Sequence, residues 1–486
     1  MATPDTADDA RGESDEIAAR LSSGDRLHVH VVGIGGAGMS AIASVLSAMG
    51  HVVSGSDLKD SSNASRLTKA GVTVHRGHDA SNVVGADLVT YSPAVPEGNV
   101  ELREARSLGL ALWPRSKVLA ALSKIRKTVA VAGTHGKTTT ASMLSLILVE
   151  AGLKPSFLIG AEVNEIGSNG VWDEGEWLVM EADESYGTFR SLRPEIVVLT
   201  NVEPDHLDYY ESFENLIEAF EGLLGSSVRT PLVCGDDRYA RALGARSGAI
   251  AVGGDGNDAY RMKDVVLGRS SAEFDIVGSE VPRGSDGPSG RDVTYGRVTL
   301  PVPGMHNALN AAMAAAAALE LGVSFGDVGR ALARFAGVPR RFEFRGVANG
   351  VTFVDDYAHL PSEVRATLAT ARSGGWERVV AVFQPHRFTR TASLSESFAD
   401  AFDDADVVVV TDVFSAGEPP IPGVSGNLVA EAIARSRASR NVRFAGSRSE
   451  LKAFLEQTLR PGDLCCTMGA GDLTTLPDEF LGAVRR

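Results

Sequence analysis

The chain of 486 residues has few cysteines, few aromatic residues and no apolar stretch long enough to cross a bilayer. Its three cysteines, Cys234, Cys465 and Cys466, lack the even number and spacing of a disulfide framework. Cys465 and Cys466 lie in an apolar run typical of a buried strand. We therefore expect a reducing compartment, the cytoplasm. Residues 1–24 are polar and acidic and lack the apolar centre of a signal peptide.

The chain also has fewer basic than acidic residues. The chain has 47 Lys and Arg residues and 62 Asp and Glu residues, which gives a formal net charge of −15. This balance argues against a nucleic-acid-binding protein, which would present a basic surface. The hydrophobic content of 44% is ordinary for a soluble globular protein, and the length predicts two to four domains. We therefore expect neither a nucleic-acid partner nor membrane insertion.

Short β-branched apolar runs alternate with Ala- and Leu-rich helical stretches along most of the chain. Eight of the runs read as buried strands: LHVHVVGIG, HVVSGSD, ADLVTYSPAV, TVAVAGT, EWLVMEAD, EIVVLTN, RVVAVFQ and ADVVVVTDV. Strands that alternate with helices predict parallel sheets of the α/β class. In such sheets, ligands bind beyond the carboxyl ends of the strands.

The alternation predicts three α/β domains after a flexible acidic tail over residues 1–24, in which one helical turn is expected near Asp15–Leu21. A Rossmann-like domain is expected over residues 25–122, and a central domain with a P-loop ATPase-like parallel sheet over residues 123–338. The central domain includes a Gly-, Asp- and Ser-rich stretch, residues 254–295, that reads as hairpins and loops. A second Rossmann-like domain is expected over residues 339–486, after a hinge at FAGVPRRFEFRG.

The first strand ends in VVGIGGAGMS, which places Gly33, Gly35 and Gly38 in G-x-G-x-x-G spacing before a helix. Asp57 ends the second strand. This is the dinucleotide-binding fingerprint, in which the glycines admit a diphosphate to a helix N-terminus and the acid meets a ribose hydroxyl. The pattern fits the nicotinamide cofactor of a dehydrogenase, and it also fits a UDP-sugar, because both ligands carry a diphosphate. A tight turn without a ligand is the third interpretation.

The strand TVAVA is followed by GTHGKTTT, a glycine-rich turn that opens a helix. Strand, turn and helix are the context of a phosphate-binding loop, in which backbone N–H groups near Gly133 and Gly136 face phosphate oxygens. Lys137 is expected to bridge phosphates, and Thr138 to reach a Mg²⁺ ion. The standard loop has a glycine where this chain has Val131, which changes the loop's shape without removing these donors.

Acidic residues follow two further strands and complete the site. WLVMEADES places Glu181 at the end of one strand, and VVLTNVEPDHLDYY places His206 beyond another. Hard Mg²⁺ prefers oxygen ligands and bridges phosphates. We therefore expect Thr138 and Glu181 to hold one ion and His206 to be a ligand to a second.

A long Ala-rich helix begins in PGMHNALN and carries His306, Asn307 and Asn310 near its start. Polar side chains at this place are candidates for holding an adenine base. The alternative for Asn307 is a purely structural role as the N-cap of the helix.

Together these motifs resemble those of one family, the Mur ligases, which are ATP-dependent amide-forming enzymes of peptidoglycan synthesis. The motifs occur in family order over nearly the whole chain: GIGGAGMS, GTHGKTTT, EADES, TNVEPDHLDYY, GMHNALN, DDYAH, FQPHRFTRT, FSAGEPPIPG and GAGD. The family's loop has the form G-T-x-G-K-T, which accounts for Val131. The resemblance implies three domains, ATP and Mg²⁺ as cofactors, a cytoplasmic location and a monomer or homodimer.

Within the family, GTHGK, FQPHR and SAGE favour ligation of L-alanine to the carboxylate of UDP-N-acetylmuramate. The resemblance implies that the sugar carboxylate attacks the γ-phosphate of ATP and that the amine then displaces phosphate from the acyl phosphate. The implied catalytic residues are Lys137, Glu181, His206 and His359. The implied metal ligands are Thr138, Glu181 and His206.

The implied binding residues form three sets. The first set holds ATP and comprises Gly133, Thr134, His135, Gly136, Lys137, Thr138, Thr139, His306, Asn307, Asn310 and Arg341. The second holds the UDP-sugar and comprises Gly33, Gly35, Gly36, Ala37, Gly38, Asp57, Ser92, Glu184 and Ser185. The third holds the amino acid and comprises Tyr357, His359, His386, Arg387 and Arg390. Arginine can bind a carboxylate bidentately, and histidine can orient or deprotonate an amine.

Three features depart from the family pattern, and one of them is the stretch 254–295, which is elongated and acidic. Leu360 follows His359 where a second His is expected, and Tyr186 follows EADES where an acidic residue is expected. Three alternatives therefore stay open. A sister ligase would use another amino acid or a murein peptide, a dehydrogenase would bind a nicotinamide cofactor at the glycine turn, and an inactive regulator would bind nucleotides without ligation.

Overall fold

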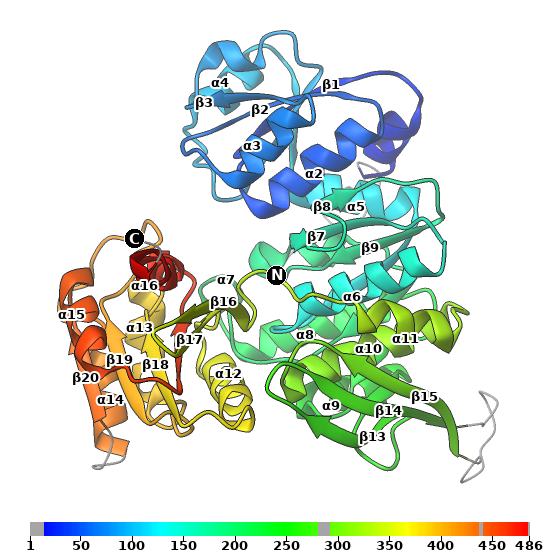
Figure 1. The fold of residues 1–486 in the computed structure, drawn as a ribbon. Helices are drawn as coiled ribbons and strands as arrows, with labels where there is room; N and C mark the ends of the chain where they lie inside the picture. The colour runs from blue at the N-terminus through cyan, green and yellow to red at the C-terminus, as the bar shows by residue number, and fades with distance from the viewer. Residues whose placement is uncertain (1–13, 280–291, 437–440, 485–486) are drawn as a thin grey trace. The chain divides into compact units, whose positions relative to one another are not determined.

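The computed structural model describes residues 14–279, 292–436 and 441–484, and within them the chain forms three β-sheets (Figure 1). All eight strands predicted from the sequence are present, and the three-domain α/β fold class is confirmed. By packing, the chain divides into two compact units. The first unit holds the N-terminal and central sheets, and the second holds the C-terminal sheet together with residues 265–273 and 299–308. The boundary between residues 122 and 123 stays a prediction.

The N-terminal sheet is parallel and has the strand order β3-β2-β1-β4-β5. Its central strand β1 contains three valines, Val29, Val31 and Val32, whose side chains are fully buried. The direction of winding reverses between β1 and β4, so the loops after these strands border the crevice where such sheets bind ligands. The elements are β1 (His28–Val32), α2 (Ala37–Ala48), β2 (Val52–Asp57), α3 (Ser62–Lys69), β3 (Thr73–Arg76), η1 (Ala80–Val83), β4 (Leu88–Tyr91), α4 (Val100–Ser107), β5 (Ala111–Pro114) and α5 (Arg115–Ile125).

A helical segment precedes this sheet, within the stretch predicted as a tail with one helical turn. Residues 14–22 are helical, and the side chains of Ile17 and Leu21 are buried. The Leu21 carbonyl also accepts a hydrogen bond from His51 Nε2 at 3.2 Å. The helix includes the turn predicted near Asp15–Leu21, and it forms because apolar side chains four residues apart share one helix face and enter a core. Residues 1–13 lie outside the described residues.

The central sheet has ten strands in the order β15-β14-β13-β12-β11-β10-β6-β9-β7-β8. Strand β6 pairs in parallel with β10 on one side and β9 on the other, so the loops after these three strands meet at one edge. The stretch predicted as hairpins contributes the neighbouring strands β13, β14 and β15.

The strands of the central sheet are β6 (Lys127–Ala132), β7 (Ser156–Val163), β8 (Ser168–Val171), β9 (Trp177–Glu181), β10 (Ile196–Leu199), β11 (Leu232–Cys234), β12 (Ile250–Gly253), β13 (Tyr260–Leu267), β14 (Ala272–Ser279) and β15 (Asp292–Leu300). Its helices are α6 (Lys137–Glu150), η2 (Ser185–Ser191), α7 (Leu207–Tyr210), α8 (Phe213–Gly225), α9 (Arg238–Ser247), α10 (Met305–Glu320) and α11 (Phe325–Ala333).

The C-terminal sheet has the order β16-β17-β21-β18-β19-β20, with β16 antiparallel to β17 and the other pairs parallel. Cys465 and Cys466 are fully buried in β21, as the sequence predicted. The elements are β16 (Glu343–Ala348), β17 (Val351–Asp356), α12 (Pro361–Ser373), β18 (Arg378–Phe383), α13 (Phe388–Leu394), η3 (Ser395–Phe398), β19 (Val407–Thr411), α14 (Asn427–Ser436), β20 (Asn441–Ala445), α15 (Arg448–Thr458), β21 (Asp463–Met468), η4 (Asp472–Thr475) and α16 (Leu476–Val484).

In the part of the chain that the structure describes, none of the helices combines the length and the apolar composition that crossing a membrane requires.

Candidate active site

The turn between β6 and α6 has the backbone of a phosphate-binding loop. Gly133 and Gly136 have φ angles of 128° and 79°, in the left-handed region that favours glycine. A Cβ atom on Gly133 would lie 2.2 Å from Thr200 Oγ1, so a larger residue does not fit there. Gly136 is the N-cap of α6, which leaves the N–H groups of the first helical turn available to an anion.

Residues that follow β10 brace this loop. The Thr134 and His135 N–H groups donate to the carbonyl and side-chain oxygens of Asn201 at 3.1 and 2.7 Å. The Thr134 hydroxyl donates to the Glu203 carbonyl at 3.2 Å. On α10, Asn310 faces the loop, because its Oδ1 lies 2.5 Å from the position of a Cβ on Gly136. Asn201 was not singled out from the sequence, although its place directly after a strand next to β6 was a usable signal.

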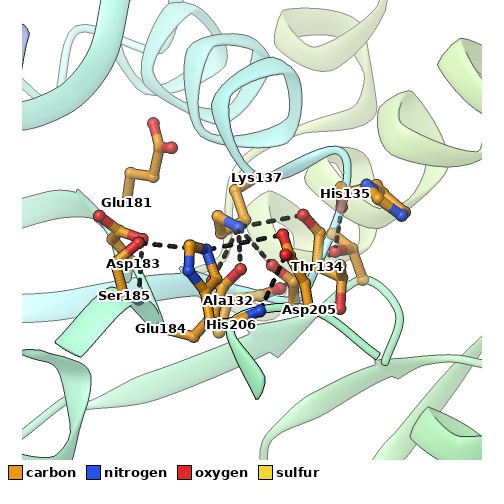
Figure 2. A network of polar contacts seen from close by, with 12 residues as sticks. Ala132, Thr134, His135, Lys137, Glu181, Asp183, Glu184, Ser185, Asp205 and His206 are labelled. Carbon is orange, nitrogen blue, oxygen red and sulfur yellow. Dashed lines mark hydrogen bonds and ion pairs between the residues drawn. The ribbon is translucent and has the colours of Figure 1, made fainter. Parts of the chain in front are cut away.

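The Lys137 ammonium lies in a nest of oxygen atoms (Figure 2). It donates to the carbonyls of Gly133 and Thr134 at 2.6 and 3.1 Å and to both carboxylate oxygens of Glu184 at 3.0 and 2.8 Å. Burial alone would lower the pKa of Lys137, but the carboxylates of Glu184, Asp183 and Glu181 outweigh it and raise that pKa. The ammonium therefore stays charged.

The predicted metal ligands fall into two groups. Thr138 Oγ1 donates to Glu181 Oε1 at 3.0 Å, so the loop hydroxyl and the acid at the end of β9 meet as expected. His206 lies with Asp183 and Glu184 instead, and these three residues place one ligand atom each within 4.8 Å of one another. Ser185 links them, since its hydroxyl donates to Asp183 Oδ1 at 2.7 Å and lies 3.3 Å from His206 Nε2.

Arg115 is a site residue that the sequence analysis missed. It begins α5 directly after β5, and its Nη2 donates to Asp183 Oδ2 at 2.8 Å. Burial would raise the pKa of Asp183, but Arg115, Lys137 and the hydrogen bonds from Ser185 hold it well below its usual range. Arg115 also lies against Gly38, where a Cβ atom would be 3.1 Å from its Nη1. Its position after a strand was the signal that could have found it.

A cavity of about 200 Å³ connects the glycine turn with the acids of β9. Ala37 and Gly38 line it from the start of α2, and Glu181 and Asp183 line it from the end of β9. Arg115 lies between these two groups in the lining. The cavity therefore offers one cationic group, two carboxylates and the backbone of a helix N-terminus to a ligand.

The residues expected to bind a UDP-sugar lie in two places, at the glycine turn of the N-terminal sheet and at the phosphate-binding loop of the central sheet. Ser92 comes from the end of β4 and packs against Gly33, where a Cβ atom would lie 3.3 Å from the Ser92 Cβ. The Asp57 carboxylate accepts the Gly35 N–H at 2.9 Å and so fixes the turn itself. Glu184 lies against Lys137 at the phosphate-binding loop, apart from the glycine turn.

The second unit brings together most of the residues assigned to the amino acid. The ring centroid of His359 lies 5.4 Å from that of Tyr357 and 5.7 Å from that of His386. The Arg390 Nη1 donates to His386 Nδ1 at 3.1 Å. Burial, followed by His359 and the nearby arginines, lowers the pKa of His386 to about 3. His386 is therefore neutral at pH 7, with Nδ1 accepting from Arg390 and Nε2–H left as a hydrogen-bond donor.

Arg387 is held in a strained backbone conformation after β18. Its φ angle is 68°, which is uncommon for a residue other than glycine, and its N–H donates to the Phe414 carbonyl at 2.8 Å. Its Nε atom is buried and makes no hydrogen bond to any residue that the structure describes. A buried guanidinium N–H in this state suits an incoming carboxylate.

Three residues assigned to ATP have partners of their own in the second unit. Asn307 is not the N-cap of α10, which begins at Met305; its side-chain amide donates to the Pro303 carbonyl at 2.7 Å. His306 Nδ1 lies 3.4 Å from Thr370 Oγ1, and burial lowers the pKa of His306 to about 4. Arg341 lies over the Tyr357 ring, 5.4 Å from its centroid.

Leu360 takes the N-cap position of α12 and is buried, with 4% of its surface exposed. Its N–H donates to Glu363 Oε2 at 3.1 Å, and its side chain offers no polar contact to a substrate. We predict that Leu360→His changes the turnover with alanine by less than about tenfold, because position 360 acts through its neighbours. The free energy of unfolding should fall by about 1–3 kcal/mol, since a polar ring replaces a buried apolar side chain. Steady-state kinetics and urea unfolding of the variant test both parts.

A loop lysine that meets strand-end acids, in a chain with three α/β sheets, is typical of an enzyme that activates a substrate with a nucleoside triphosphate. Three family models match the chain. They are the Mur ligase family catalytic domain over residues 28–127, the Mur ligase middle domain over residues 131–318, and the Mur ligase glutamate ligase domain over residues 340–471.

Relatives and solved structures agree with these models. A UDP-N-acetylmuramate–L-alanine ligase of Pelotomaculum thermopropionicum is 44% identical over 93% of this chain and 97% of its own length. One of Myxococcus xanthus is 41% identical over 94% of this chain and 95% of its own. The crystal structure of the Thermotoga maritima UDP-N-acetylmuramate–alanine ligase matches with a TM-score of 0.78 and 28% identity, over 95% of this chain and 99% of that one.

A murein peptide ligase of Psychrobacter arcticus also matches, with a TM-score of 0.67 and 25% identity, over 94% of this chain and 98% of that one. The chain belongs to the Mur ligase family. It is therefore an ATP-dependent ligase of peptidoglycan synthesis.

Proposed function

We propose that this enzyme joins L-alanine to the carboxylate of UDP-N-acetylmuramate, with ATP as the energy source and Mg²⁺ as the metal. The observation that carries the proposal is the convergence of Lys137 and Thr138 on the acids that follow β9. The printed names of the most similar relatives, such as that from Pelotomaculum thermopropionicum, support the choice of substrates. A cytoplasmic location fits the three buried cysteines, which form no disulfide.

The chemistry needs an activated carboxylate, because an amine does not displace oxide from a carboxylate at neutral pH. A carboxylate oxygen attacks the γ-phosphorus of ATP, the bond to the bridging oxygen breaks, and ADP leaves. The amine then attacks the acyl carbon, the C–O bond to phosphate breaks, and one proton leaves the nitrogen. The first step brings two anions together, so the protein must supply positive charge there, which is the role we assign to Lys137.

The donor set of the site fits Mg²⁺. Thr138 and Glu181 would hold one ion, and Asp183, Glu184 and His206 would hold a second, since carboxylate and hydroxyl oxygens suit this hard cation. When bound, Mg²⁺ neutralises phosphate charge as the phosphoryl group is transferred. Gly133 and Gly136 contribute the loop shape that lets backbone N–H groups reach the phosphates.

We place the UDP-sugar at the N-terminal glycine turn and in the cavity beside it. The turn after β1 and Ser92 after β4 border the crevice where the sheet order reverses. Arg115 supplies a cation between this turn and the acids of β9, where an anionic part of the sugar nucleotide would lie. Its contact with Asp183 keeps the guanidinium in place before the ligand arrives.

For the amino acid, we propose the group around Arg387 in the second unit. Arg387 would bind the α-carboxylate, because its buried Nε needs an acceptor. His386 is neutral at pH 7 and would orient the amino acid through its Nε2–H, and His359 beside it would take the proton from the attacking amine. A peptide nucleophile is the alternative, because a murein peptide ligase shares the fold.

A product analysis tests the proposal. The enzyme is incubated with ATP, MgCl₂, UDP-N-acetylmuramate and one candidate nucleophile at a time, and the products are identified by mass spectrometry. We expect UDP-N-acetylmuramoyl-L-alanine, ADP and phosphate with L-alanine. Ligation of a murein tripeptide without ligation of alanine would replace the proposal with the sister ligase.

The glycine turn is predicted to bind UDP-N-acetylmuramate and not NAD. A ligand that binds only the folded state raises the melting temperature by mass action, so a thermal-shift series with each ligand compares them directly. We expect stabilisation by the UDP-sugar and none by NAD at the same concentration. Stabilisation by NAD alone would restore the dehydrogenase interpretation of Gly33, Gly35 and Gly38.

A further inference from the structure

The hydrogen-bonding capacity of the Lys137 ammonium is already filled within the protein. An ammonium has three donors, and the two loop carbonyls and the Glu184 carboxylate take them up. Glu184 is buried and Lys137 nearly so, with 2% of the Glu184 side chain and 12% of the Lys137 side chain exposed. Lys137 can therefore contact a phosphate only by giving up one of these acceptors.

Glu184 cannot follow the lysine. Its own carbonyl accepts hydrogen bonds from the Tyr210 hydroxyl at 2.7 Å and from the Gly187 N–H at 3.0 Å, which fix the backbone at this point. If Lys137 moved to a phosphate, the buried Glu184 carboxylate would be left without the cation that balances it. Buried charges that lose their partner are strongly unfavourable, and burial already raises the pKa of Glu184, so its carboxylate must then take up a proton or gain another cation.

The neighbours of Glu184 can hold that replacement. Asp183 and His206 place ligand atoms within 4.8 Å of the Glu184 carboxylate, and Figure 2 shows both side chains beside Lys137. Two carboxylates and an imidazole are a ligand set for a divalent cation. Carbonyl oxygens of the loop would stay behind as the lysine swings out.

We propose that the Lys137 ammonium occupies this site when no metal is bound. A divalent cation bound by Asp183, Glu184 and His206 then displaces the ammonium toward the phosphates of the nucleotide. This inference rests on the metal assignment of the proposed function. The exchange couples the binding of the metal to the binding of the nucleotide. A metal bound by Glu184 frees the Lys137 ammonium for the phosphates, and a nucleotide that attracts the ammonium frees Glu184 for the metal. Such coupling is reciprocal by thermodynamic necessity.

The test is the binding of Mn²⁺ in the absence of nucleotide, followed by electron paramagnetic resonance of the free ion. Lys137→Met should bind Mn²⁺ more tightly than the parent enzyme, by on the order of tenfold, a typical coupling factor. Glu184→Gln should bind it more weakly. In a Glu184→Gln background, Lys137→Met should have little further effect, which separates a direct exchange from a general change in charge.

Lys127→Met is the matched control. Lys127 pairs with Glu176 at 2.7 Å, but both side chains are more than half exposed, so its removal should leave Mn²⁺ binding unchanged. A second readout is stability: Lys137→Met should melt at a lower temperature than the parent, and Mn²⁺ should restore more of that loss than in Glu184→Gln. Equal Mn²⁺ affinity in the parent and Lys137→Met would overturn the proposal. Because no substrate is present, this outcome is independent of whether ligation occurs.

Discussion

Lys137→Ala is expected to lower the rate of ligation by about 10²–10³, because it removes the ammonium that neutralises charge on the transferred phosphoryl group. The structure places this ammonium on the carbonyls of the phosphate-binding loop and on Glu184, within reach of the acids that follow β9. Single-turnover measurements with saturating UDP-N-acetylmuramate and alanine report the loss directly. A variant that keeps more than about a tenth of the parent rate would show that the loop is not the catalytic phosphate site.

Stability must be separated from chemistry in this variant. Removal of Lys137 leaves the buried Glu184 carboxylate unbalanced, which typically costs about 3–5 kcal/mol of unfolding free energy. The double variant Lys137→Ala, Glu184→Gln removes that charge and should recover part of the stability without recovering ligation. Urea unfolding of both variants beside the kinetic assay provides this control.

Arg387→Ala is expected to raise the KM for alanine much more than the KM for ATP. The buried Nε of Arg387 would bind the α-carboxylate, and such a charge-assisted contact is worth about 1.5–3 kcal/mol, or roughly 10- to 150-fold in KM. Steady-state kinetics with each substrate varied in turn measures the two constants.

Arg372→Ala serves as the matched arginine in this comparison. Arg372 lies on α12, is 40% exposed and pairs with Asp406 at 2.9 Å, so its loss should affect neither KM. Equal effects of Arg387→Ala on alanine and on ATP would remove Arg387 from the amino-acid site.

The sequence predicted best where local rules decide the structure. The eight runs are strands because β-branched apolar residues suit buried parallel sheets, and Gly133 and Gly136 shape the turn before α6 because their φ angles favour glycine. The three α/β sheets follow from the same alternation of strands and helices. The meeting of Thr138 with Glu181 could be predicted as well, since Thr138 lies at the start of the helix after β6 and Glu181 ends the adjacent parallel strand β9.

What the sequence could not predict depends on the direction of individual side chains. Glu184 and Asp183 are neighbours in EADES, yet one carboxylate balances Lys137 and the other pairs with Arg115. Spacing along an irregular loop does not fix such directions, because no helical or strand period applies there. Arg115 was missed for a related reason: it lies far from the acids in sequence, and only packing within the first unit brings it to them.

The most direct test of the acyl-phosphate account is the transfer of an oxygen atom. UDP-N-acetylmuramate labelled with ¹⁸O in both oxygens of its lactyl carboxylate is turned over with ATP and L-alanine, and the released phosphate is analysed by mass spectrometry. The account predicts one ¹⁸O atom in each phosphate, because the carboxylate oxygen that attacks the γ-phosphorus leaves with it. The other labelled oxygen should remain in the amide. Release of phosphate without any ¹⁸O, alongside formation of the alanine product, would contradict the acyl-phosphate route.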